Sequence, residues 1–177
     1  AYIPTNVISI TDGQIYLDAN IFRSGMKPAI DVGFSVSRVG GSAQKKAMRK
    51  VAGTLRIDLA QFQELEAFAQ FGSELDKESQ AQIARGQRMK ELLKQPQYTP
   101  MLVQEQVLVL FAGTKGYVDG IVVNKVLEYQ NELLSFARTK YPQVLEAIAK
   151  EKVLSAETEQ KITALLEEFK PMFKENK

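Results

Sequence analysis

Arg38 is the residue of this chain whose type and position most directly suggest chemistry. It follows Val32 to Ser37, where apolar and small polar residues alternate and predict a strand, and it precedes Gly40 and Gly41, which end that strand. A guanidinium is always charged and presents its donors in a flat fork, which suits phosphate oxygens. A strand end can direct such a group outward. The pattern therefore marks Arg38 as a candidate phosphate-binding cation.

Two alternatives stay open for Arg38 on spacing alone. Arginines near turns are frequent, so it could be an ordinary surface residue or one half of a structural ion pair. The chain contains no cysteine and no histidine, which excludes disulfides, thiol nucleophiles and imidazole bases. Chemistry would fall to carboxylates, lysines, arginines or backbone groups, and we expect no metal site.

The residues before Arg38 are expected to be rich in strands. Val7–Ile10 and Gln14–Asp18 are predicted as short strands on either side of the turn signal Thr11–Gly13. Asn20–Gly25 is predicted as one helical turn, and Lys27–Pro28 as a loop. Strands this few leave unpaired edges, so we expect them to complete a sheet with strands from elsewhere.

From Ala43 onward the apolar residues recur at helical spacing. We predict a mainly α chain in which residues 43–177 form a bundle of about six helices. Ser42 is expected to cap the first helix, Ser73 to begin a capping box for a later one, and Ser155 to cap the last, which ends near Phe169.

Composition limits the class of protein further. The chain has 177 residues, 45% of them hydrophobic and 25% charged, as in globular domains. A net charge of +2 is too small to indicate a nucleic-acid surface. No apolar run approaches the length of about 18 residues that reads as a membrane span, and no signal peptide is visible. The chain opens at Ala1 without an initiator Met, so we expect a fragment or a processed product.

Five runs of sequence stand out together: Ala1–Ile15, Ser35–Gln44, Lys50–Leu55, Ala67–Ser73 and Leu92–Tyr98. In this order they resemble the alpha subunits of the rotary, F-type ATP synthases. The similarity is dense from residue 1 to about residue 120 and looser after it. Several long runs in the right order are far more specific than a single motif.

The resemblance implies a C-terminal portion of an alpha subunit. Residues 1–42 would be the C-terminal end of an α/β nucleotide-binding domain, contributing its last strands and the arginine-finger loop. Residues 43–177 would be the C-terminal helical bundle domain. In the family, alpha and beta subunits alternate in a ring around a central stalk. The implied partners are beta subunits, the gamma subunit of the stalk, and the delta subunit or peripheral stalk through the N-terminal part of alpha.

The resemblance also implies a location and a role. The expected location is the periphery of an energy-transducing membrane, on the cytoplasmic face of a bacterial cell membrane or its organelle equivalent. The membrane would be reached only through the complex, and no nucleic acid is expected. The implied role is that of a regulatory and structural subunit of the catalytic ring during proton-driven ATP synthesis.

By resemblance, Arg38 is an arginine finger that acts in trans on the terminal phosphate of a nucleotide held by the neighbouring beta subunit. Phosphoryl transfer spreads charge over the phosphate oxygens, and an added cation stabilises that charge. Ser35 matches a position that the family needs for activity and is expected to support the loop of Arg38. Ser9 matches a serine close to the catalytic phosphate.

Alpha subunits also bind a nucleotide at a non-catalytic site. Gln95 and Gln97 match the residues that contact its adenine, and Lys27 and Pro28 lie beside it. Many members have arginine where Lys27 stands; lysine keeps the charge but loses the flat fork. The implied cofactors are ATP or ADP with Mg²⁺ in the intact complex. Because the family's phosphate loop and Mg²⁺-binding acid lie upstream of the position matching Ala1, this chain alone is expected neither to bind ATP tightly nor to hydrolyse it.

Without the resemblance, a free-standing helical adaptor is the alternative. Lys45, Lys46, Arg49 and Lys50 would then form a basic face that holds an acidic partner. A solvated helix surface accounts for the same residues equally well. An ordered, monodisperse monomer would favour the adaptor, whereas self-association or disorder before Ala43 would favour part of a ring subunit.

Overall fold

The computed structural model describes residues 2–53, 55–70 and 76–175, and the chain divides into two compact units. Unit 1 consists of Ala1–Gln44 together with Lys94–Thr99. Unit 2 consists of Lys45–Leu93 together with Pro100–Lys177. The short segment Lys94–Thr99 therefore lies between two stretches of unit 2 in the sequence but folds with the N-terminal residues.

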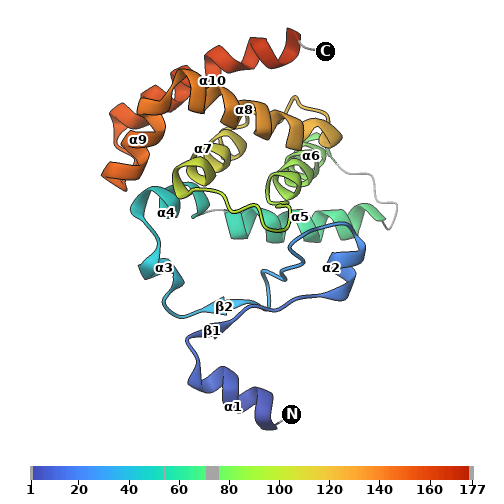
Figure 1. The fold of residues 1–177 in the computed structure, drawn as a ribbon. Helices are drawn as coiled ribbons and strands as arrows, with labels where there is room; N and C mark the ends of the chain where they lie inside the picture. The colour runs from blue at the N-terminus through green and yellow to red at the C-terminus, as the bar shows by residue number, and fades with distance from the viewer. Residues whose placement is uncertain (1, 54, 71–75, 176–177) are drawn as a thin grey trace. The chain divides into compact units, whose positions relative to one another are not determined.

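Unit 1 has short regular elements joined by ordered turns (Figure 1). In chain order they are α1 (Tyr2–Ile10), β1 (Gly13–Gln14), α2 (Ala19–Arg23), β2 (Val36–Ser37) and α3 (Gly40–Ala43). β1 and β2 pair antiparallel, and a single bridge joins Leu17 to Ile30. The Asp18 carboxylate caps α2 by accepting from the backbone N–H groups of Asn20 and Ile21, which confirms the helical turn predicted there.

The strand predicted at Val7–Ile10 is wrong, because these residues belong to helix α1. A strand must pair its backbone groups with a neighbour, whereas a helix pairs them internally. The sheet in the described part of unit 1 contains β1 and β2 alone, and it offers Val7–Ile10 no partner. Thr11 instead continues the helical pattern by donating its N–H to the Val7 carbonyl at 3.1 Å.

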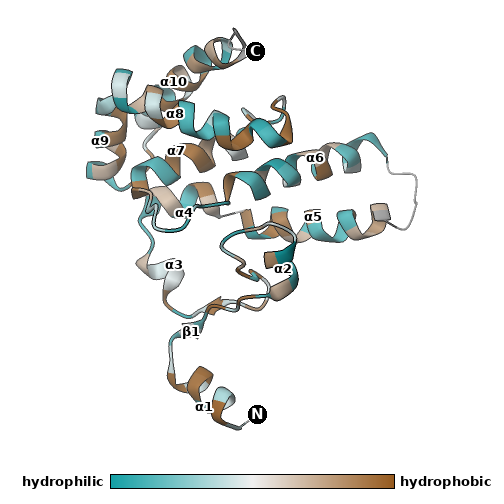
Figure 2. Cartoon of the chain, turned by 45° about the vertical axis from the view of Figure 1, so that its right-hand side comes forward, coloured by the Kyte–Doolittle hydropathy of each residue, from teal (hydrophilic) through white to brown (hydrophobic). Residues whose placement is uncertain are grey.

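The other two predicted strands are present but shorter than expected. Pairing covers Gly13–Gln14, at the start of the predicted second strand, and Val36–Ser37, at the end of the predicted third. Apolar side chains of unit 1 stay exposed, including Ile10 on α1, at 83%, and much of the α1 ribbon has the brown of hydrophobic residues in Figure 2. An exposed apolar surface of this kind is typical of a segment that packs against further protein.

The regular elements described in unit 2 are all helices, which confirms the predicted mainly α fold. Its α-helices number seven there, against about six expected: α4 (Lys46–Ala52), α5 (Leu55–Gln70), α6 (Lys77–Leu92), α7 (Val103–Thr114), α8 (Val126–Lys140), α9 (Pro142–Glu151) and α10 (Ala156–Glu175), with a 3₁₀ turn at Val123–Lys125. α7 contacts α4, α6, α8 and α9 and forms the centre of the bundle (Figure 1).

The burial of α7 follows from its sequence. Residues Val107–Gly113 are all buried, because apolar side chains occupy every side of this helix and a helix of that kind is stable only when covered. Gly113 lets α6 approach closely: a Cβ at this position would lie 2.6 Å from the Met89 sulfur and 2.8 Å from Leu92 Cδ1. α6 and α7 are therefore tightly packed against each other.

Helix ends agree only in part with the capping predictions. Ser42 caps nothing at the start of the basic helix, which begins at Lys46 rather than at Ala43. Ser73 lies outside the described residues; α6 is capped by Asp76, whose carboxylate accepts from the Ser79 N–H at 2.7 Å. Hydrogen bonds from Ser79 lower the pKa of Asp76.

The last helix begins as predicted and ends later. Ser155 Oγ accepts from the Thr158 N–H at 3.2 Å, which confirms the cap. α10 then continues past Phe169 to Glu175, with Pro171 inside it. The extra turn is held by Phe173, which is buried with its ring centroid 5.1 Å from that of Tyr129 on α8.

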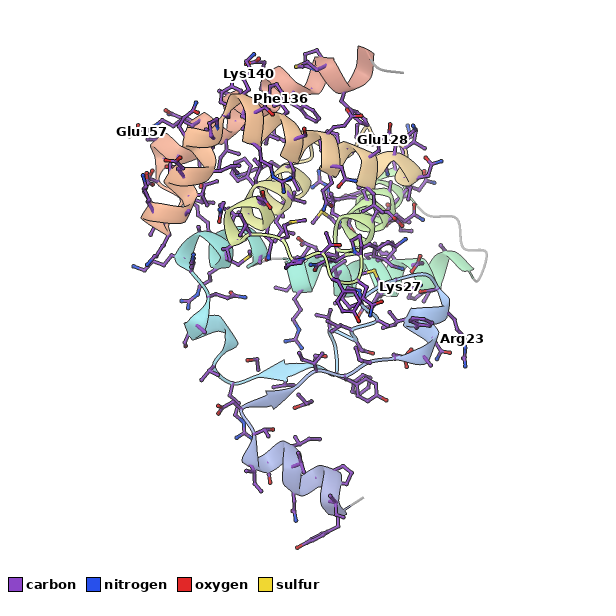
Figure 3. All side chains as sticks on the ribbon, viewed as in Figure 1. Arg23, Lys27, Glu128, Phe136, Lys140 and Glu157 are labelled. Carbon is purple, nitrogen blue, oxygen red and sulfur yellow. The ribbon has the colours of Figure 1, made fainter. Side chains whose placement is uncertain are left out.

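The C-terminal end of α8 is tied to α10 by a polar cluster. Lys140 and Tyr141 both donate to the Glu168 carboxylate, and these hydrogen bonds, that of Lys140 first, lower the pKa of Glu168. Figure 3 labels Lys140 beside Phe136, with the ammonium nitrogen 5.7 Å from the ring centroid. Across the described helices, none combines the length and apolarity that crossing a membrane would require.

Candidate functional site

The backbone around Arg38 is held by the pairing of β1 with β2. Gly13 lies opposite Ser37 in the antiparallel register, and the Arg38 N–H donates to the Asp12 carbonyl at 2.7 Å. The side chain itself is exposed. Arg38 thus lies at the end of a strand, as the alternation predicts, with its backbone fixed and its guanidinium in solvent.

The structure does not support the ion-pair alternative for Arg38. Within the described ranges, no carboxylate lies within salt-bridge distance of its guanidinium. An unneutralised guanidinium keeps its full charge and donors available for an anionic ligand. The surface-turn reading and the phosphate-binding reading both remain compatible with this geometry.

Two serines fix the backbone on either side of Arg38. Ser35 Oγ accepts from the Tyr16 N–H at 3.0 Å, and Ser37 Oγ accepts from the Gly40 N–H at 2.8 Å. The first bond joins the stretch before β2 to the stretch after β1, and the second closes the turn after Arg38.

Ser9 does not take part in this hydrogen-bonded arrangement. Its hydroxyl donates to the Asn6 carbonyl at 2.8 Å, inside α1. This hydrogen bond does not connect Ser9 to the loop of Arg38. The structure brings Ser35 and Arg38 into one hydrogen-bonded loop, and the predicted role of Ser9 stays a prediction.

Gly13 is required by the pairing that fixes Arg38. Its φ is +149°, and a Cβ built on it would collide with the backbone carbonyl of Val36 on the paired strand. We therefore expect Gly13→Ala to break the β1–β2 pairing, and amide exchange at Arg38 to become at least about tenfold faster, a free-energy loss of about 1.4 kcal/mol. Hydrogen exchange measures this. Gly41→Ala is the matched control, since a Cβ there meets nothing within 4 Å; equal exchange in both variants would refute the role of Gly13.

A second candidate site is a pocket of about 870 Å³ that lies wholly within unit 1. It brings Lys27 and Pro28 together with Gln95 and Gln97. These are the four residues that the resemblance marked as nucleotide contacts, and the two pairs are far apart in the sequence. Its lining residues are Leu17, Asp18, Ala19, Phe22, Lys27, Pro28, Ala29, Gln95, Pro96 and Gln97.

Hydrogen bonds hold the two glutamines in this pocket. The Gln95 N–H donates to the Lys27 carbonyl at 2.9 Å, which joins the two halves of the lining. The Gln95 side chain donates through Nε2 to the Thr99 carbonyl at 2.7 Å. Thr99 Oγ1 donates to the Gln97 carbonyl at 3.2 Å. Lys27, labelled in Figure 3, places Nζ 5.0 Å from the centroid of the Phe22 ring.

The lining combines apolar walls with a few polar groups. The apolar surface comes from Leu17, Phe22, Pro28 and Pro96, and the polar groups are the carboxamides of Gln95 and Gln97 and the Lys27 ammonium. The Asp18 carboxylate also lines the pocket, but it is engaged in capping α2. Such a combination suits a flat heterocycle with a polar edge and an anionic tail. The residues present therefore fit the base of a nucleotide.

Other lining residues could not be identified as site residues from the sequence, namely Leu17, Asp18, Ala19, Phe22, Ala29 and Pro96. The sequence feature that could have pointed to this lining is Phe22, an aromatic residue in the predicted helical turn just before Lys27–Pro28. Among the residues that the structure describes, no group of three or more acidic side chains could hold a metal ion.

One of the basic residues that suggested an adaptor, Lys50, makes contacts within unit 2. Lys50 forms an ion pair with Glu159 and donates to the Leu154 carbonyl at 3.3 Å, and so ties α4 to the start of α10. A lysine committed to its own fold contributes less to an external acidic partner. This contact favours an internal structural role for part of the basic cluster.

Comparison with known proteins gives two family matches and a close relative. The model described as "ATP synthase alpha/beta chain, C terminal domain" matches residues 44–169, and that described as "ATP synthase alpha/beta family, nucleotide-binding domain" matches residues 1–37. ATP synthase subunit alpha of Wolinella succinogenes is 58% identical over 173 residues, which cover 98% of this chain and 35% of that protein. The chain thus spans about a third of the length of this relative.

Proposed function

Since the chain belongs to the ATP synthase alpha/beta family, we propose that it acts as the C-terminal part of an ATP synthase alpha subunit and that Arg38 is an arginine finger for the neighbouring beta subunit. The finger's guanidinium would lie against the terminal phosphate of the nucleotide bound there. It would stabilise the negative charge that develops on the transferred phosphoryl group.

The observation that carries this proposal is the geometry at Arg38. Its backbone is fixed by the Asp12 carbonyl and by strand pairing, while its side chain is exposed and has no carboxylate partner in the described part of the chain. A cation on a rigid backbone reaches a partner's phosphate at a smaller entropic cost than one on a mobile loop. Ser35 would act as a positioning residue through its bond to Tyr16, and Ser9 would lie near the same phosphate. The test is the turnover of the assembled complex carrying Arg38→Lys.

The pocket of unit 1 is proposed as part of a non-catalytic nucleotide site. Gln95 and Gln97 would contact the adenine, with Lys27 and Pro28 beside it. The lysine supplies charge without the bidentate geometry of an arginine, so its contact would be a point-charge one. ATP or ADP with Mg²⁺ is the proposed ligand in the intact complex, and Mg²⁺ would neutralise phosphate charge there.

The remaining assignments follow from the proposed subunit. Residues 1–42 would end a nucleotide-binding domain, and residues 43–177 would form the C-terminal helical domain. The proposed partners are beta subunits in an alternating ring, the gamma subunit of the central stalk, and the delta subunit or peripheral stalk. The complex would lie at the periphery of an energy-transducing membrane, and the chain would contribute to ATP synthesis coupled to proton transport.

The isolated chain is expected to bind ATP weakly. It carries no phosphate-loop motif, so the pocket would grip the base and leave most phosphate oxygens in water. A millimolar affinity at millimolar ATP adds only about 0.4 kcal/mol to stability, so the melting temperature should hardly move. Scanning fluorimetry with an ATP titration measures this. A saturable shift at micromolar ATP would show that the chain holds a complete site by itself.

A further inference from the structure

The segment Lys94–Thr99, termed the strap, carries two of the pocket's polar residues and joins two helices of unit 2. It folds with unit 1, yet α6 ends at Leu92 just before it and α7 begins at Val103 just after it. Any restraint on the strap therefore acts on both helix ends.

The strap is internally stiff. Gln95 Nε2 bonds the Thr99 carbonyl and Thr99 Oγ1 bonds the Gln97 carbonyl, so both hydrogen bonds close within six residues of chain. Pro96 has a fixed φ, and Tyr98 holds a left-handed φ of +59°. A short segment with these restraints moves as a unit rather than bending at one residue.

The connections from the strap to the two helices have little slack. Leu93 is the C-cap of α6, with its N–H on the Met89 carbonyl at 3.2 Å, so Lys94 alone separates the cap from Gln95. On the other side Leu102 is the N-cap of α7. Gln106 Nε2 donates to the Met101 carbonyl at 2.8 Å, which fixes the residue before that cap.

Beyond these connections α6 and α7 form one packed body. Met89 and Leu92 lie against Gly113 with no space for a Cβ between them, and both are buried. Arg88 Nε donates to the Ile121 carbonyl at 2.7 Å, which ties α6 to the loop after α7. A restraint at the strap thus reaches a rigid helix pair.

We propose that the strap couples two properties of the chain. When a nucleotide base occupies the unit 1 pocket, the last turn of α6 and the first turn of α7 become more stable against local opening. The proposal rests on the nucleotide site proposed above. A base seated against Gln95 and Gln97 restrains the strap, and the short connections pass that restraint to the last turn of α6 and the first turn of α7. The pocket is then a control point for the helical unit as well as a binding site.

Hydrogen exchange on the assembled complex tests this coupling. Complex containing the full-length subunit is freed of nucleotide, loaded with Mg²⁺ and ADP, and compared with the unloaded form. We expect exchange in residues 89–93 and 103–107 to slow by about fivefold or more. ADP retained after gel filtration is counted in parallel. The double variant Gln95→Ala/Gln97→Ala corrects for ADP bound at other sites and should lose both the extra ADP and the protection.

A second variant tests the strap itself. Two glycines inserted after Leu93 and two after Pro100 should keep ADP retention and abolish the slowed exchange; Pro100→Gly, which keeps the chain length, should weaken it. ADP retained in the pocket without slowed exchange would overturn the coupling but leave the nucleotide site standing. Equal ADP retention in the parent and the double glutamine variant would overturn the nucleotide site. Protection that survives the glycine insertions would show that the strap is not the route.

Discussion

Arg38→Lys in the full-length subunit, assembled with its beta subunits, is expected to lower ATP turnover by about 10³- to 10⁵-fold. That loss corresponds to roughly 4 to 7 kcal/mol of transition-state stabilisation. Lysine keeps the positive charge, but its single ammonium cannot present two parallel donors to phosphate oxygens, and its reach differs. Steady-state ATP hydrolysis by the purified complex measures the effect.

Two controls separate this role from a structural one. Because the Arg38 side chain is exposed and its backbone bond to Asp12 is unaffected by the change, the variant complex should assemble at the normal stoichiometry. Arg23→Lys is the matched control: this exposed arginine bonds Asn20 within α2, and its loss should leave turnover near normal. Near-normal turnover with Arg38→Lys would instead make Arg38 an ordinary surface residue.

Phe62→Ala is expected to lower the free energy of unfolding of the helical unit by about 3 to 5 kcal/mol. Phe62 is 1% exposed on α5, and its ring packs against the backbone of α6 at Gly86. Removing the ring leaves a cavity that the two helices cannot close without moving. Urea denaturation followed by circular dichroism measures the loss. Phe68→Ala on the same helix is the control, because Phe68 is 63% exposed and should cost little.

Gly86 provides a second, independent check on this packing. A Cβ at Gly86 would overlap the Phe62 ring, so Gly86→Ala alone should destabilise by about 1 to 3 kcal/mol. Placed on Phe62→Ala, the same methyl no longer meets the ring atoms at 2.2 and 2.3 Å, but the Cβ of residue 62 stays 2.6 Å away, so only part of the clash is relieved. The two changes should therefore couple favourably, with a double variant less destabilised than the sum of the single variants. Simple additivity would mean that Phe62 and Gly86 do not share the contact.

The helical unit could be predicted closely because each helix carries its own apolar pattern. The spacing of Val107, Leu108 and Phe111 predicts a helix without knowledge of its neighbours. Capping was less predictable, because several nearby residues can serve. Asp76 caps α6 although Ser73 begins an equally good pattern, and the basic helix begins at Lys46, beyond the reach of the cap expected from Ser42.

Unit 1 was harder to predict because its elements depend on partners. Val7–Ile10 has the composition of a strand and folds as a helix, since pairing decides which form is stable. The pocket likewise depends on a contact distant in sequence, between Gln95 and Lys27, that no local pattern encodes. Gln95, Gln97, Lys27 and Pro28 were reached through family resemblance, whereas Phe22 and Pro96 became visible only once the pocket had formed.

The interleaved order of the two units constrains how such chains can recombine. Residues 1–44 and 94–99 fold together although the helices α4, α5 and α6 separate them in sequence. A chimera with a single crossover after Gln44 would join the N-terminal stretch of one parent to the strap of another. Exchanges that take both stretches from the same parent, by paired crossovers or by one crossover after Thr99, keep together the two segments that the hydrogen bond from the Gln95 N–H to the Lys27 carbonyl joins.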